Sequence, residues 1–480
     1  MREGRSVSSS PDPSVRRPTR SPSGIGARAA VVLVVALLAL AGWQVGGAFW
    51  LLAIPLAALL GTPLFTILAL VGLVAFAAEG ISSAAVVTEM VRLAGSPVLI
   101  SIPLFTFAGY LFAEAGTPQR LVRLTRAAVG WIPGGLAIVA MIACAVFTAF
   151  TGASGVTIIA LGGLLMPALR ADRFSPRFSL GLLTTGGSLG ILFPPSLALI
   201  IYSYVATQSA GVSLTNPLAG PTVDRLFLAG IVPGALLIAL LGVYAVLRVR
   251  RWKSPRPTFR WGELGAALRG AIWEVPLPFL LLGGIYGGKL TVTEAAAATA
   301  LYALIVEVFI YRDIPLRRLF GVIRESMTLV GGILVILAAA MGLTNYLIDA
   351  EVPMQILTGI EGLITSPIGF LLALNAFLLI VGCLMDIFSA LIVVVPLVVP
   401  VAQNYGVDLT HLGIVFLTNL EIGYMTPPVG MNLFISSFRF RRPILEVYFA
   451  TLPFLLILVV ALLLVTYIPQ ISLFLVDLLG

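Results

Sequence analysis

Long apolar runs recur along the chain from residue 29 almost to the C-terminus, with short polar connections between them. A helix of about 18 or more apolar residues is long enough to span a bilayer. Stretches such as 31–42 and 455–465 are continuously apolar, so they lack the alternation of apolar and polar residues that a membrane β-barrel requires. The pattern therefore predicts an all-α polytopic membrane protein.

Two of the apolar stretches are interrupted in the middle. Stretch 131–169 is interrupted by TGASG at 151–155, and stretch 368–401 is interrupted at 385–387. Arginines flank both ends of the first stretch, whereas Arg-poor connections flank both ends of the second. Because basic connections stay on the cytoplasmic side, we expect two re-entrant helical hairpins that enter from opposite faces, the first with its tip at Ser154.

Each predicted hairpin is followed by an apolar run broken by a double proline, at 184–203 and at 418–437. One constant spacing of 233 residues pairs Gly109 with Gly342, Pro167 with Pro400, Gly190 with Gly423, Pro194 with Pro427, Pro195 with Pro428 and Ser203 with Ser436. Three predicted spans lie between the two units, near 226–248, 272–288 and 294–311. Because an odd number of spans inverts the second unit, the chain is predicted to be an inverted repeat with broken transmembrane helices.

The same pattern gives the boundaries of the chain's parts. The predicted segments are a disordered basic tail (1–28), an extra N-terminal transmembrane helix (29–45), N-terminal scaffold helices (46–96), the first repeat unit (97–203), scaffold helices with a basic cytoplasmic loop (204–325), the second repeat unit (326–437) and a C-terminal transmembrane helix (438–480). For the first repeat unit to begin on the correct side, stretch 49–78 must cross twice, with a turn at 61–63.

Composition narrows the class of protein further. The chain is 59% hydrophobic and 10% charged, whereas soluble domains carry about 25% charged residues. The net charge of +8 is spread over short connections, so it sets orientation and does not form a surface for nucleic acid. Cys144 and Cys383 lie in separate apolar runs, which favours a packing role over a disulfide or a metal site.

The breaks in the apolar runs predict where the chemistry lies. Backbone that is not helical survives at membrane depth only when it is buried in protein or lines a polar cavity, so four breaks predict one central site. Prolines at 194–195 and 427–428 leave upstream carbonyls free. Such carbonyls, with Ser and Thr hydroxyls, suit a small cation such as sodium. Helix amino ends after Ser154 and near Pro195 suit an anionic group.

Three ionisable residues are the remaining candidates for function. Asp386 lies within an apolar run, where a carboxylate is expected to face a cavity or a cation, and it can also cap the helix that follows. Glu421 is either functional or paired with a neighbouring helix. His411, the only histidine, lies in a connection predicted to face outside, so we expect it at the surface.

The interrupted units at 147–169, 181–196, 383–400 and 419–434 resemble the large membrane (permease) subunit of tripartite ATP-independent periplasmic (TRAP) transporters, over residues 46–470. The resemblance implies a multi-pass inner-membrane permease, with no enzymatic activity, that imports organic acids of the C4-dicarboxylate or sugar-acid type. It implies sodium ions for coupling and no other cofactor. Its partners would be a small four-helix membrane subunit, an extracytoplasmic solute-binding protein and membrane lipid, with no nucleic acid.

The resemblance also implies positions for the ligands. One sodium site would involve Ser154, Gly155, Thr185, Gly187 and Ser188, and a second would involve Asp386, Gly423, Met425 and Thr426. The solute would lie between them, near Thr157, Ser196 and Asn432, beside the helix breaks at Pro194, Pro195, Pro427 and Pro428. By the same resemblance, the hairpins and broken helices form a mobile transport domain that works as an elevator. The N-terminal 45 residues depart from the usual large subunit.

Two alternatives stay open on the sequence. A stand-alone ion-coupled anion carrier of related fold would share the physics of the site and need no partners. GASG at 152–155 matches the short pattern of an intramembrane serine protease, whose serine needs a histidine as base. The protease hypothesis would depend on His411 and leaves the repeat unexplained. No GxxxxGK[ST] motif for ATP is present in the sequence.

Overall fold

The computed structural model describes residues 62–78, 82, 84–132, 134–210, 220–249, 258–361, 364 and 366–479. The predicted tail, the predicted helix at 29–45 and part of the predicted double crossing at 49–78 lie outside these residues. The chain divides into two compact units, Met1–Ala84 and Ala85–Gly480. Helix α3 (Leu64–Ala78) is the described helix of the first unit, and everything below concerns the second unit.

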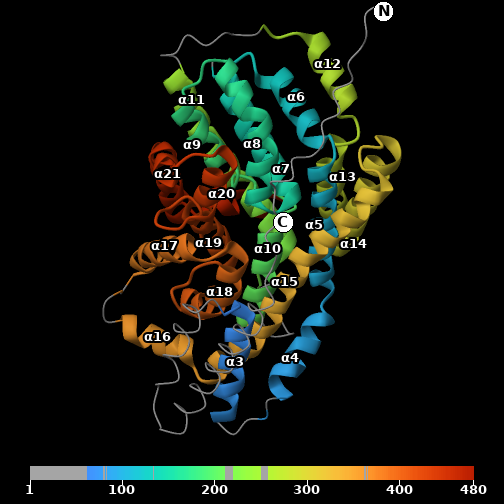
Figure 1. Ribbon diagram of the computed structural model, residues 1–480. Helices are drawn as coiled ribbons and strands as arrows, with labels where there is room; N and C mark the ends of the chain where they lie inside the picture. Colours follow the sequence, from blue (N-terminus) through green and yellow to red (C-terminus); the bar gives the residue numbers. More distant parts are fainter. Residues whose placement is uncertain are drawn as a thin grey trace, which may run out of the picture. The chain divides into compact units, whose positions relative to one another are not determined.

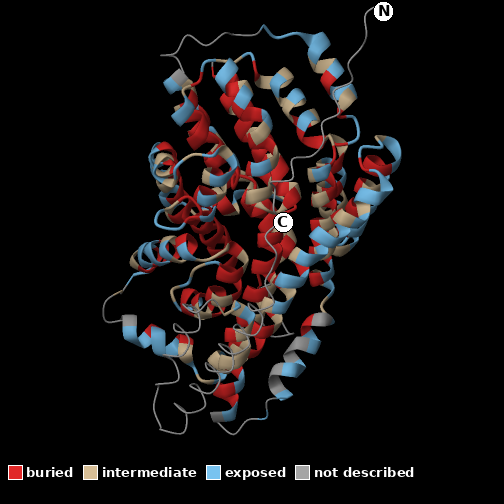
Figure 2. Ribbon diagram, viewed as in Figure 1, coloured by how far each residue is buried: buried red, intermediate tan, exposed pale blue. Residues whose placement is uncertain are grey.

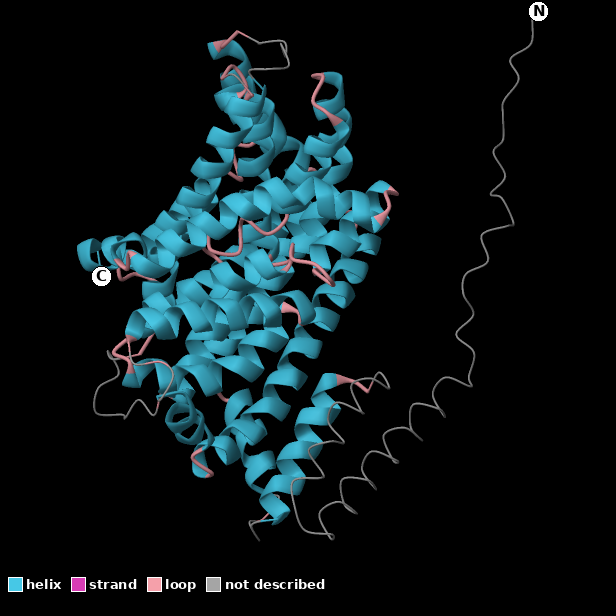
Figure 3. Ribbon diagram, turned by 90° about the vertical axis from the view of Figure 1, so that its left-hand side faces the viewer, coloured by secondary structure: helices cyan, strands magenta, loops and turns pink. Residues whose placement is uncertain are grey.

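The described residues of the second unit are helical and contain no strand (Figure 3). The helices before the centre of the chain are α4 (Ala84–Ala94), α5 (Pro97–Glu114), α6 (Thr117–Val129), α7 (Gly135–Thr151), α8 (Ser154–Ala171), α9 (Pro176–Gly186), α10 (Leu197–Ser209), α11 (Val223–Val249), α12 (Trp261–Gly270), α13 (Pro276–Tyr286) and α14 (Val292–Leu304), which continues as a π-helical turn, η3 (Ile305–Ile310). They are followed by α15 (Leu316–Asp349), α16 (Val352–Glu361), α17 (Pro367–Leu384), α18 (Ile387–Asn404), α19 (Leu409–Gly423), α20 (Met431–Phe440), α21 (Ile444–Tyr467) and α22 (Gln470–Leu479).

Helix length and composition agree with a polytopic membrane protein. Among the described residues, eight helices are long and apolar enough to cross a membrane. They are Pro97–Glu114, Ser154–Ala171, Val223–Arg248, Val292–Ile310, Leu316–Asp349, Pro367–Leu384, Ile387–Asn404 and Ile444–Tyr467. Shorter apolar helices, including α7, α10 and α19, accompany them, as expected for hairpins and for spans broken in two.

Two pairs of helices stand where the interrupted stretches predict hairpins. Helix α7 ends at Thr151 and α8 starts at Ser154, while α17 ends at Leu384 and α18 starts at Ile387. The bounds of α8 and α18 are 233 residues apart at both ends, which is the spacing of the sequence repeat. The helix boundaries therefore repeat as the residue types do.

The two double-proline runs are broken in the same way. Helix α9 ends before the first pair and α10 starts after it, and α19 and α20 flank the second pair. The Pro194–Pro195 and Pro427–Pro428 peptide bonds are both cis. The prediction of an all-α membrane protein with two repeated units, each with a helical hairpin and a broken helix, is thus confirmed.

Within the second unit, the α7–α8 pair lies above the α17–α18 pair, with α10, α19 and α20 near the centre (Figure 1). Helix α8 packs against α20, α17 packs against α19, and α10 packs against α18, so each hairpin contacts a broken helix. Buried residues gather in these central helices, and every residue of α19 is buried (Figure 2). Cys144 and Cys383 are both buried, as residues with a packing role would be.

Two arginine-rich segments between apolar runs, 114–126 and 312–324, were expected to be connections on the cytoplasmic side but are largely helical. The segment after α5 is the amphipathic helix α6, and residues 316–324 are the first turns of α15. Arg120 of α6 binds three carboxylates, those of Glu274, Glu307 (2.8 Å) and Asp313 (2.6 Å). A single arginine of a basic helix can thus be largely buried when carboxylates pair with it, which a count of basic residues does not reveal.

Candidate functional site

The tip of the first hairpin packs on the break between α9 and α10. A Cβ added at Gly187 would lie 2.4 Å from Ile158 Cγ1 and 3.2 Å from the carbonyl oxygen of Ser154. Only glycine lets the two backbones approach so closely. The Thr148 hydroxyl of α7 donates to the Gly187 carbonyl (2.9 Å). Two members of the first proposed sodium set, Ser154 and Gly187, are therefore neighbours.

Hydroxyl groups line this junction. The Thr148 hydroxyl also bonds the Thr157 hydroxyl (2.7 Å), and both side chains are buried. Ser188 is bonded through its hydroxyl to the Thr185 carbonyl (3.4 Å). The Thr185 hydroxyl is buried and has no partner among the described residues. Since a buried polar atom is rarely left unsatisfied, this oxygen is free for a ligand.

The tip of the second hairpin is organised by Asp386. Its side chain caps α18 by accepting the N–H groups of Phe388 (3.0 Å) and Ser389 (3.0 Å), and it accepts the Ser389 hydroxyl as well. A carboxylate offers about four acceptor positions. Three are occupied in this arrangement, which leaves room for about one further ligand.

This second tip packs on the break between α19 and α20. A Cβ at Gly423 would lie 2.6 Å from the Cα of Gly382, so these backbones also touch. The N–H of Gly430 donates to the Cys383 carbonyl (3.0 Å), and the Ile387 N–H donates to the Tyr424 hydroxyl. The residues around Asp386 and Gly423 are therefore held together as one close-packed, hydrogen-bonded junction.

Met425 and Thr426, the other members of the second proposed set, lie in this break. Met425 is fully buried, and its N–H donates to the Ile422 carbonyl (2.9 Å). The Thr426 hydroxyl also donates to the Ile422 carbonyl (2.9 Å). Both residues are in the segment expected for the site, but the Thr426 hydroxyl already has a backbone partner.

The two junctions are joined through α20. Gly155 of the first hairpin faces Ile435, since a Cβ there would lie 2.7 Å from Ile435 Cδ1. The Thr184 hydroxyl of α9 donates to the Ser436 hydroxyl (2.8 Å). Helix α20, which begins at the second break, thus runs along the first hairpin and the first broken helix.

The three residues predicted to bind solute differ in their hydrogen bonding. Ser196 caps α10 by accepting the Leu199 N–H (3.4 Å), and Thr157 is bonded to Thr148 as described. Asn432 at the start of α20 is fully buried, and neither its amide nitrogen nor its amide oxygen has a partner among the described residues. Asn432 therefore has the greatest unused hydrogen-bonding capacity of the three.

The expectation for His411 needs correction, and for Glu421 one of the two open alternatives finds no support. His411 is not at the surface: it is 2% exposed, and its ring bonds the Ser472 hydroxyl (2.6 Å) and the Thr466 carbonyl (3.2 Å). The prediction was wrong because α21 and α22 cover the start of α19. Glu421 is fully buried, yet neither carboxyl oxygen has a partner among the described residues, so the suggested pairing with a neighbouring helix is absent there.

No role in the site was predicted for Thr148 or for Ser436, although Ser436 is one of the residues paired by the 233-residue spacing. Thr148 links α7 to the first break, and Ser436 links α20 to α9. The available signal was weak: each is a small polar residue in an apolar helix. Among the described residues, no three His, Cys, Asp or Glu side chains gather as a metal site. The free and backbone oxygens at the breaks suit a hard cation better than a transition metal.

Comparison with known proteins places the chain in a family. The family model described as "Tripartite ATP-independent periplasmic transporter, DctM component" matches residues 49–471. The C4-dicarboxylate TRAP transporter large permease protein DctM of Pseudomonas aeruginosa is 38% identical, with 80% of this chain and 87% of that protein covered. The ectoine/5-hydroxyectoine TRAP transporter large permease protein UehC of Ruegeria pomeroyi is 35% identical, with 79% and 86% covered.

A solved structure shows the same fold at low sequence identity. The crystal structure of the Alcanivorax borkumensis YdaH transporter, described as having an unusual topology, matches with a TM-score of 0.56 at 15% identity. The match covers 79% of this chain and 86% of that one. The family model and the sequence identity show that the chain belongs to the DctM family of TRAP transporter large permeases, multi-pass proteins of the inner membrane, and its long apolar helices agree with this.

Proposed function

We propose that the chain is the solute-translocating subunit of a sodium-coupled importer of organic acids. The observation that supports this most is the pair of junctions in which each hairpin tip packs on a broken helix, with unsatisfied polar atoms at Thr185 and Asn432 beside them. Free polar atoms buried at membrane depth are costly unless a ligand satisfies them.

One sodium ion is proposed at each junction. The first would be held by Ser154, Gly155, Thr185, Gly187 and Ser188, and the second by Asp386, Gly423, Met425 and Thr426. Backbone carbonyls released at the breaks and hydroxyl oxygens provide the oxygen ligands that sodium needs. The unused hydroxyl of Thr185 and the remaining acceptor position of Asp386 support these assignments.

The solute is proposed to lie between the junctions, near Asn432, Thr157 and Ser196. No Arg or Lys occurs in either hairpin stretch or either double-proline run. The charge of a carboxylate would therefore be balanced by the two sodium ions and by the amino ends of α8 and α10, each worth about 0.3–2 kcal/mol. Solute binding should consequently be weak without sodium.

We propose a C4-dicarboxylate as the first solute to test, with a sugar acid as the second. The relatives are named for different solutes, C4-dicarboxylate and ectoine, so membership of the family does not choose between solutes. The elevator motion of hairpins and broken helices is part of the same proposal. It is supported by the way α20 joins both junctions into one body.

The proposed partners are a small four-helix membrane subunit and an extracytoplasmic solute-binding protein. The family is one component of a tripartite transporter. The longest polar stretches in this sequence, 1–28 and 248–270, are too short for a domain that traps solute. Capture from dilute medium would then depend on a separate protein.

Reconstitution into liposomes tests the proposal. With an inward sodium gradient, the purified chain alone should move little succinate, and addition of both partners with loaded binding protein should give uptake. Replacement of sodium by potassium should abolish that uptake. Robust uptake by this chain alone would instead favour the stand-alone carrier.

The geometry gives no support to the protease alternative. Its serine, Ser154, would need a base, and the ring of His411 bonds Ser472 and Thr466. Both ring nitrogens are thus occupied, one by Thr466 of α21 and the other by Ser472 of α22.

A further inference from the structure

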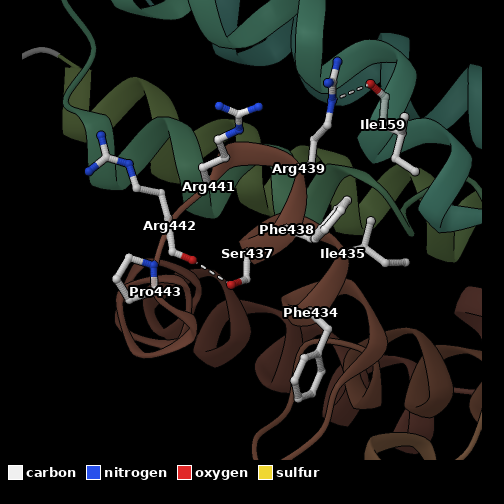
Figure 4. A pocket seen from close by; sticks show the side chains of 9 residues that line it. All are labelled: Ile159, Phe434, Ile435, Ser437, Phe438, Arg439, Arg441, Arg442 and Pro443. Carbon is white, nitrogen blue, oxygen red and sulfur yellow. Dashed lines mark hydrogen bonds between the residues drawn. The ribbon is translucent and has the colours of Figure 1, made fainter. Parts of the chain in front are cut away.

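A groove of about 1050 Å³ lies beside α20 and the turn that follows it. It is lined by side chains of α20, by the turn from α20 into α21 and by Ile159 of α8 (Figure 4). None of these residues belongs to the proposed sodium or solute sets. The groove therefore contains none of the proposed sodium or solute ligands, although its residue Ile435 also packs beside Gly155 of the first hairpin.

One side of the groove is strongly basic. Arg439, Arg441 and Arg442 line it, and Arg442 is paired with Glu446 (3.6 Å). Arg439 and Arg441 have no acidic partner among the described residues. Two exposed guanidinium groups thus remain uncompensated beside one cavity.

Arg439 is held in place by the neighbouring helix. Its Nε donates to the Ile159 carbonyl (2.9 Å; Figure 4). Its guanidinium lies over Gly163, where a Cβ would be 2.1 Å from Nη2. Only one of its five N–H donors is used in this way. The others are available to an acceptor in the groove, and the side chain needs little further ordering to bind one.

The other side of the groove is apolar. Phe434 and Phe438 are one helical turn apart on α20, and their exposed fractions are 51% and 89%. Ile159 of α8 is 52% exposed beside them. Exposed apolar side chains on a membrane protein contact acyl chains, whereas a small hydrophilic anion gains nothing from them.

We infer that this groove binds an anionic phospholipid of the cytoplasmic leaflet, with its phosphate at Arg439 and Arg441 and an acyl chain along Phe434 and Phe438. The basic turn at 439–442 is on the cytoplasmic side by the positive-inside rule. Anionic lipids concentrate in that leaflet, and basic pockets between helices there bind their headgroups. The apolar wall favours the lipid over a free phosphate or a released dicarboxylate.

Binding of defined lipids to the purified full-length chain in detergent tests the inference, with native mass spectrometry as the readout. The probes are dioleoyl phosphatidylglycerol and dioleoyl phosphatidylcholine. The natural chain should prefer phosphatidylglycerol. Arg441→Gln should weaken that binding about fivefold, because a basic residue near anionic lipid contributes about 1 kcal/mol. Adding Arg439→Gln should weaken it roughly 25-fold in total.

Arg173→Gln is the matched control. Arg173 is exposed near the end of α8, outside the groove, and shares with Arg441 a left-handed backbone (φ 64° and 52°). It should change phosphatidylglycerol binding less than twofold. The double variant Phe434→Ala with Phe438→Ala should weaken binding of both lipids, since it removes the acyl contact and keeps the charges.

Three results would overturn the inference. They are equal affinity for the two lipids, an equal loss in Arg173→Gln and Arg441→Gln, and displacement of phosphatidylglycerol by millimolar succinate. The last result would assign the groove to the solute as it leaves for the cytoplasm. The thermal unfolding of each variant is measured alongside. An unfolding temperature equal to that of the natural chain excludes loss of folding as the cause of weak binding.

Discussion

Replacing Asp386 separates two roles that its position combines, capping of α18 and binding of sodium. The carboxylate accepts two backbone N–H groups and one hydroxyl. Asp386→Asn keeps a side chain that caps well and removes the charge, whereas Asp386→Ala removes both. We expect Asp386→Asn to raise the sodium concentration for half-maximal uptake at least tenfold.

The magnitudes distinguish the two roles. Loss of an N-cap costs about 0.5–2 kcal/mol of stability, so Asp386→Ala should be destabilised by about that amount and Asp386→Asn by much less. A tenfold change in sodium dependence corresponds to about 1.4 kcal/mol. That change should be present in both variants, because both lack the carboxylate.

The assay is succinate uptake by the complete reconstituted transporter over a range of sodium concentrations, with thermal unfolding of each variant in parallel. Asp408→Ala is the control. Asp408 caps α19 by accepting the His411 N–H (2.9 Å), so it has the same capping role away from the hairpin tip. This variant should lose similar stability and keep the natural sodium dependence.

An unchanged sodium dependence in Asp386→Asn would refute the assignment and leave Asp386 as a cap alone. A shift of equal size in Asp408→Ala would show that the effect comes from general loosening of the fold.

Three further predictions follow from buried contacts, each measured as thermal unfolding in detergent. Arg120→Gln should lower the free energy of unfolding by about 3–5 kcal/mol, because it leaves the buried carboxylates of Glu274 and Glu307 without a counter-ion. Its control, Arg123→Gln on the exposed face of the same helix, should be nearly neutral. Similar losses in the two variants would contradict the role of Arg120 in pairing these carboxylates. Glu421→Gln should leave the free energy of unfolding unchanged, since neither carboxyl oxygen has a partner among the described residues. A decrease of more than about 3 kcal/mol would instead show that Glu421 belongs to a buried ion pair. Gly190→Ala should lower the free energy of unfolding by about 1–3 kcal/mol, because the added Cβ would lie 2.1 Å from the Ala145 carbonyl oxygen. Gly331→Ala, where no atom lies within 4 Å, should be neutral or slightly stabilising, and equal effects at the two glycines would contradict the close packing at the first break.

The fold could be predicted from the sequence because its determinants are local. Long apolar runs, glycine and proline at the breaks and the asymmetry of arginine between connections each act over a few residues. The constant spacing of 233 residues then related the halves, and the bounds of α8 and α18 keep that spacing. Helix α6 could not be predicted in this way, because its arginines are typical of a connection between spans and its apolar face is short.

The side-chain contacts of the site could not be predicted in the same way. Thr184 and Ser436 are separated by 252 residues, and Thr148 and Gly187 are separated by 39, so neither pair follows from local pattern. His411 was misplaced for the same reason: its partners Thr466 and Ser472 come from the end of the chain. Sequence located the breaks, and the tertiary packing decided which polar atoms remain free.

The opposite orientation of the two hairpins is the claim on which the central site depends. Arg170 at the end of α8 and Gln403 at the end of α18 are both exposed, and each can carry a single cysteine once Cys144 and Cys383 are replaced by alanine. A membrane-impermeant maleimide, applied to right-side-out and inside-out vesicles, measures the side of each position. The inverted repeat predicts cytoplasmic labelling at 170 and periplasmic labelling at 403, and labelling of both from one side would contradict it.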